Sequence, residues 1–238
     1  MADGFGIPLS GLQSALFRQD VTANNIANVV TPGFQAQRAD QVDLGGGGSR
    51  AASTTTLRGP GALEATGNPI DLAVDGEGFF QVRTAEGGTA YTRAGSFRID
   101  ANRNLVTGSG EVVQPAFQVP QDATAIQFTA TGQVNALLAN GTVQQVGQLQ
   151  LARFPNSSGL TRRGDSLLEA NGASGAAEVG DPGQGAFGRV VSGALEGSNV
   201  DLAGELVGTR VNALLFRANL RVIRAEDDML GEALDLKG

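Results

Sequence analysis

Residues 202–234 read LAGELVGTRVNALLFRANLRVIRAEDDMLGEAL, and this stretch decides the fold class. Mostly apolar residues recur in it on alternating steps of four and three, which is the pattern of a coiled-coil seam. A helix of this length reaches roughly 50 Å at about 1.5 Å per residue. That is longer than an ordinary globular domain of this size needs, so the stretch favours helix–helix association. The seam consists of Leu202, Leu206, Thr209, Ala213, Phe216, Leu220, Ile223, Asp227, Leu230 and Leu234.

The beginning of the chain carries a matching pattern in residues 9–30. Pro32 and Gly33 end this pattern, since proline disfavours helix in the residue before it and glycine permits a turn. A single amphipathic helix could equally pack on its own domain. The matching C-terminal seam favours an interface between helices, either within one chain or between copies of it. The N-terminal seam consists of Leu9, Leu12, Leu16, Ala23, Ile26 and Val30, with Gln19 in the one polar position.

The residues between the two seams have a different character. Residues 37–62 contain four consecutive glycines and a Ser/Thr-rich run, which indicates a linker or an extended arm. Short β-type segments then alternate with turns, and Asn140-Gly141 is a strong hairpin signal. We therefore predict an α+β fold in which an antiparallel, barrel- or sandwich-like all-β domain is inserted between terminal helices. The predicted parts are an N-terminal helix in 1–36, the linker in 37–62, the β domain in 63–192 and a C-terminal helix in 193–238.

The composition offers little for catalysis or for metal binding. The chain has no Cys and no His, so thiolate chemistry, a Ser-His-Asp arrangement and an ordinary zinc site are excluded. Its formal net charge of −7 argues against binding to a nucleic-acid backbone. The chain has no apolar run of about 18 residues for a membrane span and no secretory signal pattern. We expect no cofactor and no metal site, while an enzyme that uses two carboxylates remains an alternative.

Charges are separated along the C-terminal stretch. Its arginines precede a block of acids, and acids in the last turns of a helix oppose the helix dipole. We interpret the two blocks as charge pairs between stacked subunits, a head-to-tail contact that propagates. The alternative is a solvated face with local pairs between residues four apart. The residues concerned are Arg217, Arg221, Arg224, Glu226, Asp227 and Asp228.

A set of short motifs spans most of the chain. Those near the start are Ser10-Gly11-Leu12-Gln13-Ser14-Ala15, Ala23-Asn24-Asn25-Ile26-Ala27-Asn28 and Thr31-Pro32-Gly33-Phe34. The central ones are Asn68-Pro69-Ile70-Asp71-Leu72-Ala73-Val74, Gly76-Glu77-Gly78-Phe79-Phe80 and Tyr91-Thr92-Arg93-Ala94-Gly95-Ser96-Phe97. The last is Leu195-Glu196-Gly197-Ser198-Asn199-Val200. In this order the motifs resemble those of the bacterial flagellar rod and hook protein family. The positions that carry the resemblance best are Asn24, Asn25, Asn28, Pro32, Gly33, Phe34, Ser198 and Asn199.

The resemblance implies an axial structural protein and no enzyme. In that family the terminal helices pair as an antiparallel coiled coil in an inner tube, and the β domain forms the outer layer. The subunits leave the cell unfolded through the type III export apparatus, without a cleaved signal peptide. They polymerise helically into the periplasm-spanning rod of the basal body, which transmits torque from the motor to the hook and filament. The implied partners are copies of the chain, neighbouring rod and hook proteins, the surrounding bushing rings and the export apparatus, with no nucleic acid and no membrane insertion.

The position within the axis is a finer expectation. The central motifs are most similar to those of the distal rod, and the chain has no room for the further β domains of hook proteins. A proximal rod protein or a hook protein is the alternative within the family. From another class, a secreted β-domain adhesin or cap module with helical oligomerisation tails is also consistent with the residues.

Overall fold

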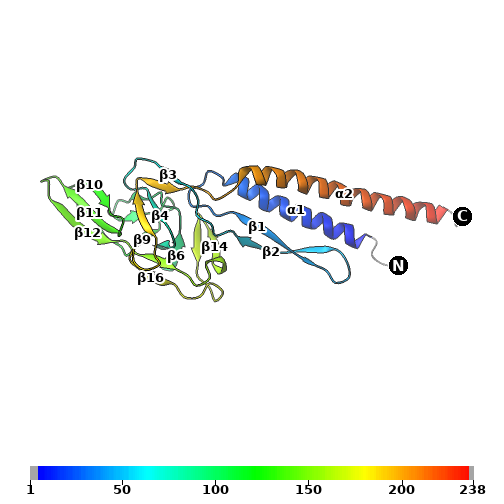
Figure 1. The fold of residues 1–238 in the computed structure, drawn as a ribbon, viewed down its shortest axis with the longest axis horizontal. Helices are drawn as coiled ribbons and strands as arrows, with labels where there is room; N and C mark the ends of the chain where they lie inside the picture. The colour runs from blue at the N-terminus through cyan, green and yellow to red at the C-terminus, as the bar shows by residue number, and fades with distance from the viewer. Residues whose placement is uncertain (1–4, 236–238) are drawn as a thin grey trace. The chain divides into compact units, whose positions relative to one another are not determined.

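The structure is a computed structural model that describes residues 5–235. Its residues divide into two compact units. Of the described residues, 5–29, 36–57 and 200–235 form the helical unit, and 30–35 and 58–199 form the β unit. The predicted fold class is confirmed, since the N- and C-terminal helices contact each other and come before and after a central antiparallel β domain in the sequence (Figure 1).

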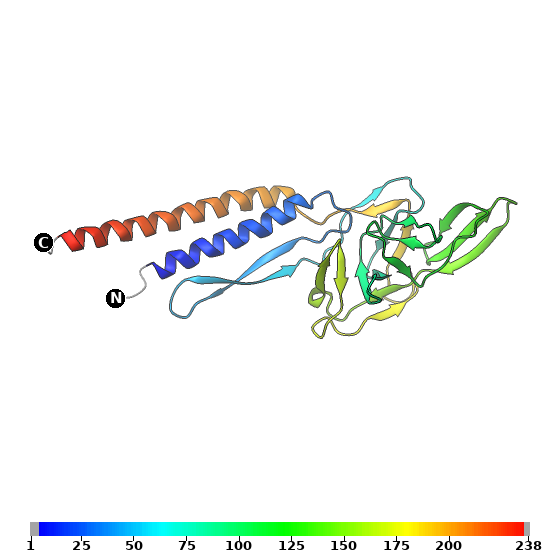
Figure 2. The same cartoon turned by 180° about the vertical axis from the view of Figure 1, so that it is seen from behind.

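The helical unit contains two helices and one hairpin. Helix α1 spans Gly6–Ala27 and helix α2 spans Leu202–Asp235. Strands β1 (Gln37–Asp43) and β2 (Ser49–Thr56) form an antiparallel hairpin inside the segment predicted as a linker or extended arm. Figures 1 and 2 show α1 and α2 lying side by side and running in opposite directions.

Local chemistry explains where α2 begins. The Asp201 carboxylate accepts a hydrogen bond of 3.1 Å from the Ala203 N–H, which satisfies one of the free donors of the first turn. Glu205 lies in that first turn, where the helix dipole favours a negative charge. Helix α1 ends at Ala27, before Thr31 and Pro32, so Val30 of the predicted seam lies beyond the helix.

The β unit is built from short antiparallel strands. A nine-stranded sheet has the order β14-β15-β6-β5-β9-β8-β7, with β13 paired to β5 and β16. A separate three-stranded sheet is formed by β10-β11-β12, and two pairs, β17-β4 and β18-β3, complete the unit. The strands are β3 Leu63–Ala65, β4 Leu72–Asp75, β5 Phe79–Arg83, β6 Thr89–Thr92, β7 Arg98–Ile99, β8 Leu105–Val106, β9 Val112–Gln114, β10 Ala123–Phe128, β11 Gln133–Leu138, β12 Val143–Gln148, β13 Leu151–Arg153, β14 Thr161–Gly164, β15 Leu167–Glu169, β16 Glu178–Gly180, β17 Arg189–Ser192 and β18 Ala194–Glu196.

The predicted Asn140-Gly141 turn joins β11 to β12. Gly141 has a φ of +81°, and the Asn140 side chain accepts a hydrogen bond of 2.9 Å from the Thr142 N–H. Both features are those of a tight turn in which a left-handed residue suits the twist of the strands. The strongest local turn signal in the sequence therefore corresponds to an observed hairpin.

A hydrophobic core holds the β unit together. Leu72, Phe80 and Leu105 are each at most 1% exposed, and the rings of Phe80 and Phe97 meet edge to face at 5.1 Å. A second cluster is formed around Tyr91 and Phe154, whose rings meet edge to face at 4.7 Å. Neither helix in the described part of the chain combines the length and apolarity that a membrane span requires.

Candidate assembly surfaces

Polar and small residues take part in the contact between α1 and α2. The Arg18 side chain donates from Nε to the Asn212 Oδ1 at 3.1 Å, and Asn212 is only 6% exposed. Gly11 faces Asn219 so closely that an added Cβ would lie 2.6 Å from the Asn219 Oδ1. From Gly11 to Arg18 the residue number increases along α1, while the number of the partner on α2 decreases from 219 to 212. The two helices are therefore antiparallel.

Asn25, one of the predicted motif residues, holds three segments of the helical unit together. Its Nδ2 donates to the Gln37 carbonyl at 2.7 Å and to the Glu205 Oε1 at 2.6 Å, while its Oδ1 accepts from the Gln37 N–H at 2.9 Å. The residue is 1% exposed, and a buried amide needs such partners to offset the loss of hydration. Asn24 is exposed beside it, and Asn28 donates to the Asn24 carbonyl at 2.9 Å.

The predicted seams are at most half-buried in the single chain. Phe216, Leu220 and Ile223 of α2 and Leu12 and Ile26 of α1 are half-buried. Most other seam positions remain accessible in the single chain, and the side chain of Leu234 lies outside the described residues. The exposed ones are Leu9 at 49%, Leu16 at 52%, Val30 at 86%, Leu202 at 42%, Leu206 at 52% and Leu230 at 52%.

Leu16 and Phe216 line a groove on the helix pair. The groove has a volume of about 250 Å³, and its lining also includes Ala15, Ala213 and the stem of Arg217. Four of the eight lining residues are apolar, the other four being Gln19, Thr209, Asn212 and Arg217, and the predicted seams supply Leu16, Gln19, Thr209, Ala213 and Phe216. The seam residues therefore meet at an apolar depression that stays open in the single chain.

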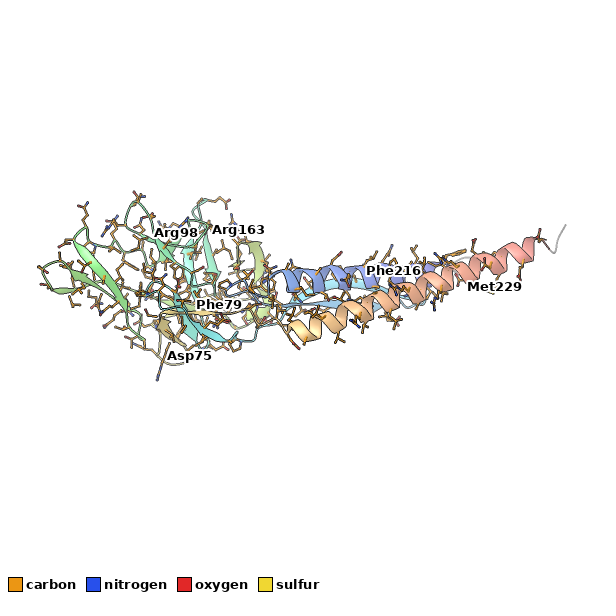
Figure 3. The ribbon with its side chains drawn as sticks, turned by 90° about the horizontal axis from the view of Figure 1, so that it is seen from above. Asp75, Phe79, Arg98, Arg163, Phe216 and Met229 are labelled. Atoms are coloured by element: carbon orange, nitrogen blue, oxygen red, sulfur yellow. The ribbon has the colours of Figure 1, made fainter. Side chains whose placement is uncertain are left out.

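A second apolar stripe runs along α2 and was not identified from the sequence. Its members follow steps of four and three and share no position with the predicted seam. Val207 is 62% exposed, Leu214 is 68% exposed and Met229 is 61% exposed, and Figure 3 labels Met229 and Phe216 on the same helix. The stripe consists of Val207, Val211, Leu214, Ala218, Val222, Ala225 and Met229.

The charge blocks of α2 form no ion pairs within the described part of the chain. The ion pairs there join Arg38 to Asp40, Arg93 to Glu196, and Arg163 to both Glu86 and Glu169. Local pairs along α2, the alternative interpretation of its charges, are therefore not formed among residues 202–235. The six residues of the two blocks are exposed, except for the half-buried Glu226.

In the β unit the N-terminal and C-terminal motifs meet. Gly33 has a φ of +65°, and an added Cβ would lie 2.4 Å from the Ala94 nitrogen, so only glycine fits. The Gly33 N–H donates to the Glu196 carbonyl at 2.7 Å, and the Asn199 N–H donates to the Phe34 carbonyl at 3.3 Å. The motif around Gly33 therefore contacts Glu196 at the end of β18 and Asn199 shortly after it.

A buried ion pair lies at the centre of that contact. Arg93 Nη1 is 3.1 Å from Glu196 Oε2, and the two residues are 7% and 2% exposed. Arg93 also donates to the Gly76 carbonyl at 2.9 Å, and the other Glu196 oxygen accepts from the Gly61 N–H at 3.0 Å. The sequence motifs contained both residues, but their separation by more than a hundred positions hid the pairing. A charged residue within each otherwise uncharged motif was the available signal.

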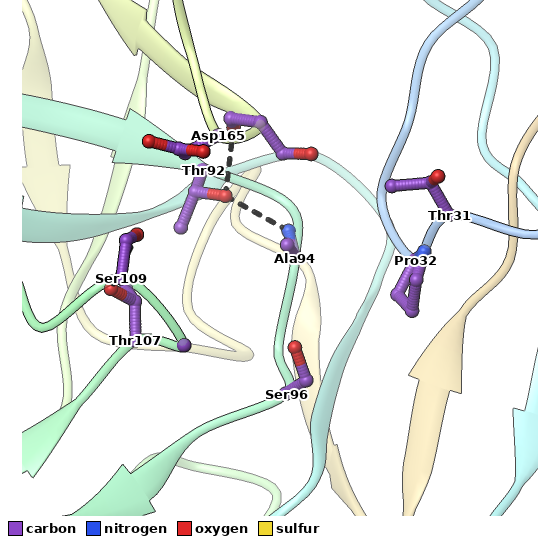
Figure 4. A pocket seen from close by; sticks show the side chains of 10 residues that line it. Thr31, Pro32, Thr92, Ala94, Ser96, Thr107, Ser109 and Asp165 are labelled. Carbon is purple, nitrogen blue, oxygen red and sulfur yellow. Dashed lines mark hydrogen bonds between the residues drawn. The ribbon is translucent and has the colours of Figure 1, made fainter. Parts of the chain in front are cut away.

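A hydroxyl-rich pocket lies beside Pro32 (Figure 4). It has a volume of about 410 Å³ and is lined by Thr31, Thr92, Ser96, Thr107, Ser109 and Ser166, among others. The Thr92 hydroxyl is held by the Ala94 N–H and the Ser166 carbonyl, each at 3.0 Å. Asp165 is the one titratable group in the lining, so the pocket lacks the pair of acid and base groups that hydrolysis needs.

Three family models match the chain in the order of its motifs. Residues 8–35 match the flagella basal body rod protein model, and residues 73–136 match the D1 domain of the flagellar hook protein FlgE/F/G. Residues 191–236 match the C-terminal part of the flagellar basal body rod FlgEFG protein. The first and last matches cover most of the two helices, and the middle match lies in the β unit.

Similar proteins extend over nearly the whole chain. The flagellar basal-body rod protein FlgG of Agrobacterium fabrum is 36% identical over 248 residues, covering 94% of this chain and 95% of the relative. The FlgG of Bacillus subtilis strain 168 is 36% identical over 256 residues, with coverages of 96% and 97%. The flagellar basal-body rod protein FlgF of Escherichia coli K12 is 33% identical over 246 residues, with coverages of 96% and 95%.

Proposed function

Since the chain belongs to the flagellar basal-body rod protein family, we propose that it polymerises helically through its terminal helices and transmits torque from the motor to the hook and filament. The chain is a structural subunit of that family, and the family is not enzymatic. We infer from the residues of the helical unit how the subunit contacts its neighbours.

The apolar stripe on α2 carries the proposal. Large apolar side chains that are exposed in a row on a soluble chain often mark an interaction site. The stripe runs from Val207 to Met229 with coiled-coil steps, so it suits a second helix better than an irregular partner. Burying it stabilises an assembly by about 25 cal/mol for each Å² of apolar area removed from water.

Two separate apolar faces favour a polymer over a closed dimer. The groove at Leu16 and Phe216 lies between the helices, whereas the stripe uses different positions of α2. If one face of a subunit binds the other face of the next, the contact is heterologous and leaves a free face at each end. Growth then continues, as a rod requires.

The charge blocks of α2 supply a second contribution. We propose that Arg217, Arg221 and Arg224 of one copy face the acids Glu226, Asp227 and Asp228 of the next. None of the six has an ion-pair partner among residues 5–235 of its own chain. Reversing the charges of Asp227 and Asp228 should weaken assembly, more so at low salt, where such attractions are screened least. Assembly at wild-type levels at both salt concentrations would reject this part.

The central experiment compares two valines that are exposed to the same degree. Val207 of α2 is 62% exposed and Val143 of the β unit is 59% exposed. We expect Val207→Asp to abolish sedimentable polymers, because it places a charge in the stripe, and Val143→Asp to leave them intact. Circular dichroism of both variants should match that of the native chain. Equal polymerisation by the two variants would refute the stripe as the contact.

Our proposal for the position in the flagellum and for the partners is based on the family. The chain is a flagellar basal-body rod protein, and neither described helix is suited to span a membrane. We propose a place in the periplasm-spanning rod, with neighbouring rod and hook proteins, the bushing rings and the type III export apparatus as partners. Export as an unfolded chain without a cleaved signal peptide suits a sequence with no Cys to crosslink.

The distal rod is the position that we favour. The similarity to FlgG of two distant bacteria supports it, while the similarity to FlgF of Escherichia coli makes the proximal rod the second candidate. Expression of the chain in a strain that lacks FlgG and in a strain that lacks FlgF distinguishes the two positions. We expect motility to return in the strain without FlgG, and restoration only in the strain without FlgF would assign the chain to the other position.

A further inference from the structure

The groove between α1 and α2 combines apolar side chains with positive charge. Leu16 and Phe216 line it, and Arg217 is the one charged residue among its lining residues. Arg217 is exposed and forms no ion pair within residues 5–235. The other charged residues within three positions of the lining are Arg18, Asp20 and Arg210. An occupant that carries an apolar side chain with acids beside it would therefore suit this groove.

Charge excludes the first half of the apolar stripe on α2 as that occupant. Residues three and four apart on a helix are neighbours on its surface. Leu214 therefore lies between Arg210 and Arg217, and Val207 also neighbours Arg210. Placing either side chain in the groove of another copy would bring these arginines close to the Arg217 of that copy. Like charges repel, so this half of the stripe is a poor match.

Met229, at the far end of the stripe, has acidic surroundings. Asp228 precedes it and Glu232 lies one turn beyond it, and the two acids are neighbours on the helix surface because they are four residues apart. Both acids are exposed, and Met229 is 61% exposed. Neither acid has an ion-pair partner within residues 5–235. The end of the stripe therefore offers the charges that the groove lacks.

The side chain of Met229 also suits the groove. Methionine is unbranched and flexible, so it fills irregular apolar spaces, and its sulfur makes favourable contacts with aromatic rings. Phe216 supplies such a ring in the lining. Leu230 is the nearest competitor, since it is 52% exposed and Asp227 lies three residues before it. It is less exposed than Met229 and offers no sulfur to the ring.

We propose that this groove receives Met229 of a second copy of the chain. Asp228 and Glu232 of that copy then face Arg217. The contact rests on the proposed polymerisation and names the residues that meet in it. It joins two different places on the same kind of subunit, so each added copy leaves a free groove at one end and a free Met229 at the other.

The position of Met229 along α2 prevents it from filling the groove of its own chain. Gly11 faces Asn219 and Arg18 contacts Asn212, so Leu16 lies at a level of α2 between these two asparagines. Met229 is more than two turns farther along α2 than Asn219, and Figure 3 shows it beyond Phe216 on the same helix. At about 1.5 Å per residue, two copies that point the same way would be displaced by roughly 20 Å along the helix axis.

The first measurement uses cysteines, because the native chain has none that could react. The double variant Leu16→Cys/Met229→Cys is assembled and then mildly oxidised. A disulfide needs Cα atoms within about 7 Å, which Met229 does not reach in its own chain, so any bond between the two positions joins two copies. Since each copy carries both cysteines, we expect a ladder of covalent oligomers on a non-reducing gel.

The matched control is Leu16→Cys/Val207→Cys. Val207 lies on the same stripe and is 62% exposed, against 61% for Met229. We expect no ladder from it, and the single variants can form nothing larger than a dimer. Circular dichroism of all variants should match that of the native chain. A ladder of equal strength from the Val207 control, or a ladder from Leu16→Cys/Leu230→Cys alone, would overturn the proposal.

The second measurement tests the charges around Met229. In the Leu16→Cys/Met229→Cys background, Arg217→Glu should weaken the ladder at low salt, where attraction between charges is screened least. Adding Glu232→Arg should restore it at least in part, because the two signs are then exchanged. Arg98→Glu, which changes an exposed arginine on β7, should have no effect. A ladder that Arg217→Glu leaves unchanged would refute the charge contact.

The outcomes separate this contact from the proposed function. Sedimentable polymers that form without a bond between positions 16 and 229 would refute the contact and leave polymerisation standing. A bond that forms only in short soluble oligomers would support the contact and contradict assembly into a rod. A native chain that forms no polymer, with no bond in the double variant, would contradict both.

Discussion

Phe80 of the β unit is 1% exposed, whereas Leu214 of α2 is 68% exposed, although both are large apolar side chains within regular elements. The β unit buries its apolar residues inside one chain. Most of the exposed large apolar side chains lie instead in the helical unit, on both helices and on the hairpin. The comparison teaches that one unit is completed by its own chain, whereas the other exposes the apolar surfaces that we propose as contacts with other copies.

The largest expected effect tests that comparison directly. Phe80→Ala should lower the free energy of unfolding of the β unit by about 3–5 kcal/mol, because it removes a ring from a packed core and leaves a cavity. Leu214→Ala should change the stability of the monomer by less than about 0.5 kcal/mol, as for an ordinary surface position. Urea unfolding of both variants measures this. A comparable loss in Leu214→Ala would mean that the monomer already buries the stripe.

The next effect concerns the buried ion pair of the β unit. Glu196→Gln removes the partner of the Arg93 guanidinium and should cost about 3 kcal/mol, since it leaves a buried charge uncompensated. The midpoint of urea unfolding should fall, while Glu64→Gln, which changes an exposed acid on the paired strand β3, should leave it nearly unchanged. Equal midpoints for both variants would show that the pair contributes little.

A smaller effect separates backbone strain from steric conflict at the joined motifs. Gly33 and Gly67 have similar φ values of +65° and +72°, but an added Cβ meets backbone atoms at Gly33 and nothing within 4 Å at Gly67. Gly67→Ala should cost about 1 kcal/mol and Gly33→Ala at least about 2 kcal/mol by thermal or urea unfolding. An equal loss of free energy of unfolding in both variants would mean that the backbone at Ala94 can shift away from an added Cβ at Gly33 with little strain.

The smallest effect is a dependence on pH in the β unit. The backbone N–H of Asn104 lowers the pKa of Asp100 below its ordinary value of 3.8. The ionised form is thus favoured in the folded state, so its contribution is present above the ordinary pKa and is lost as the pH falls through the folded-state pKa. Asp100→Asn should therefore lower the urea midpoint at pH 6 more than at pH 3. A deficit of the same size at both values would contradict the interpretation.

Local sequence signals predicted much of the fold. Coiled-coil steps located both helices, and the Asn140-Gly141 turn located a hairpin, because each depends on residues close together in the chain. The hairpin of β1 and β2 lacked such a signal. Its strands are rich in Ser, Thr and charged residues and show no alternation of apolar and polar positions, so residues 37–62 were interpreted as a linker or arm.

The assembly surfaces were less predictable for a physical reason. A periodic pattern identifies an apolar face but not the partner that covers it. The strongest pattern was assigned to a seam, yet the residues that α1 and α2 bury between them include Asn25 and Asn212. The seam stays a prediction for contacts between copies. The pairing of Arg93 with Glu196 depends on the whole fold and could not be derived from either motif by itself.

The hydrogen bonds of the Asn25 amide couple the ordering of three segments of the helical unit. One of its hydrogen bonds requires α2, and the other two require the first residue of the hairpin. A partly ordered chain would leave at least one buried group unsatisfied, at a cost of about 1–3 kcal/mol. Segments near positions 25, 37 and 205 should therefore gain protection against hydrogen exchange together, so that the helical unit becomes ordered in one step.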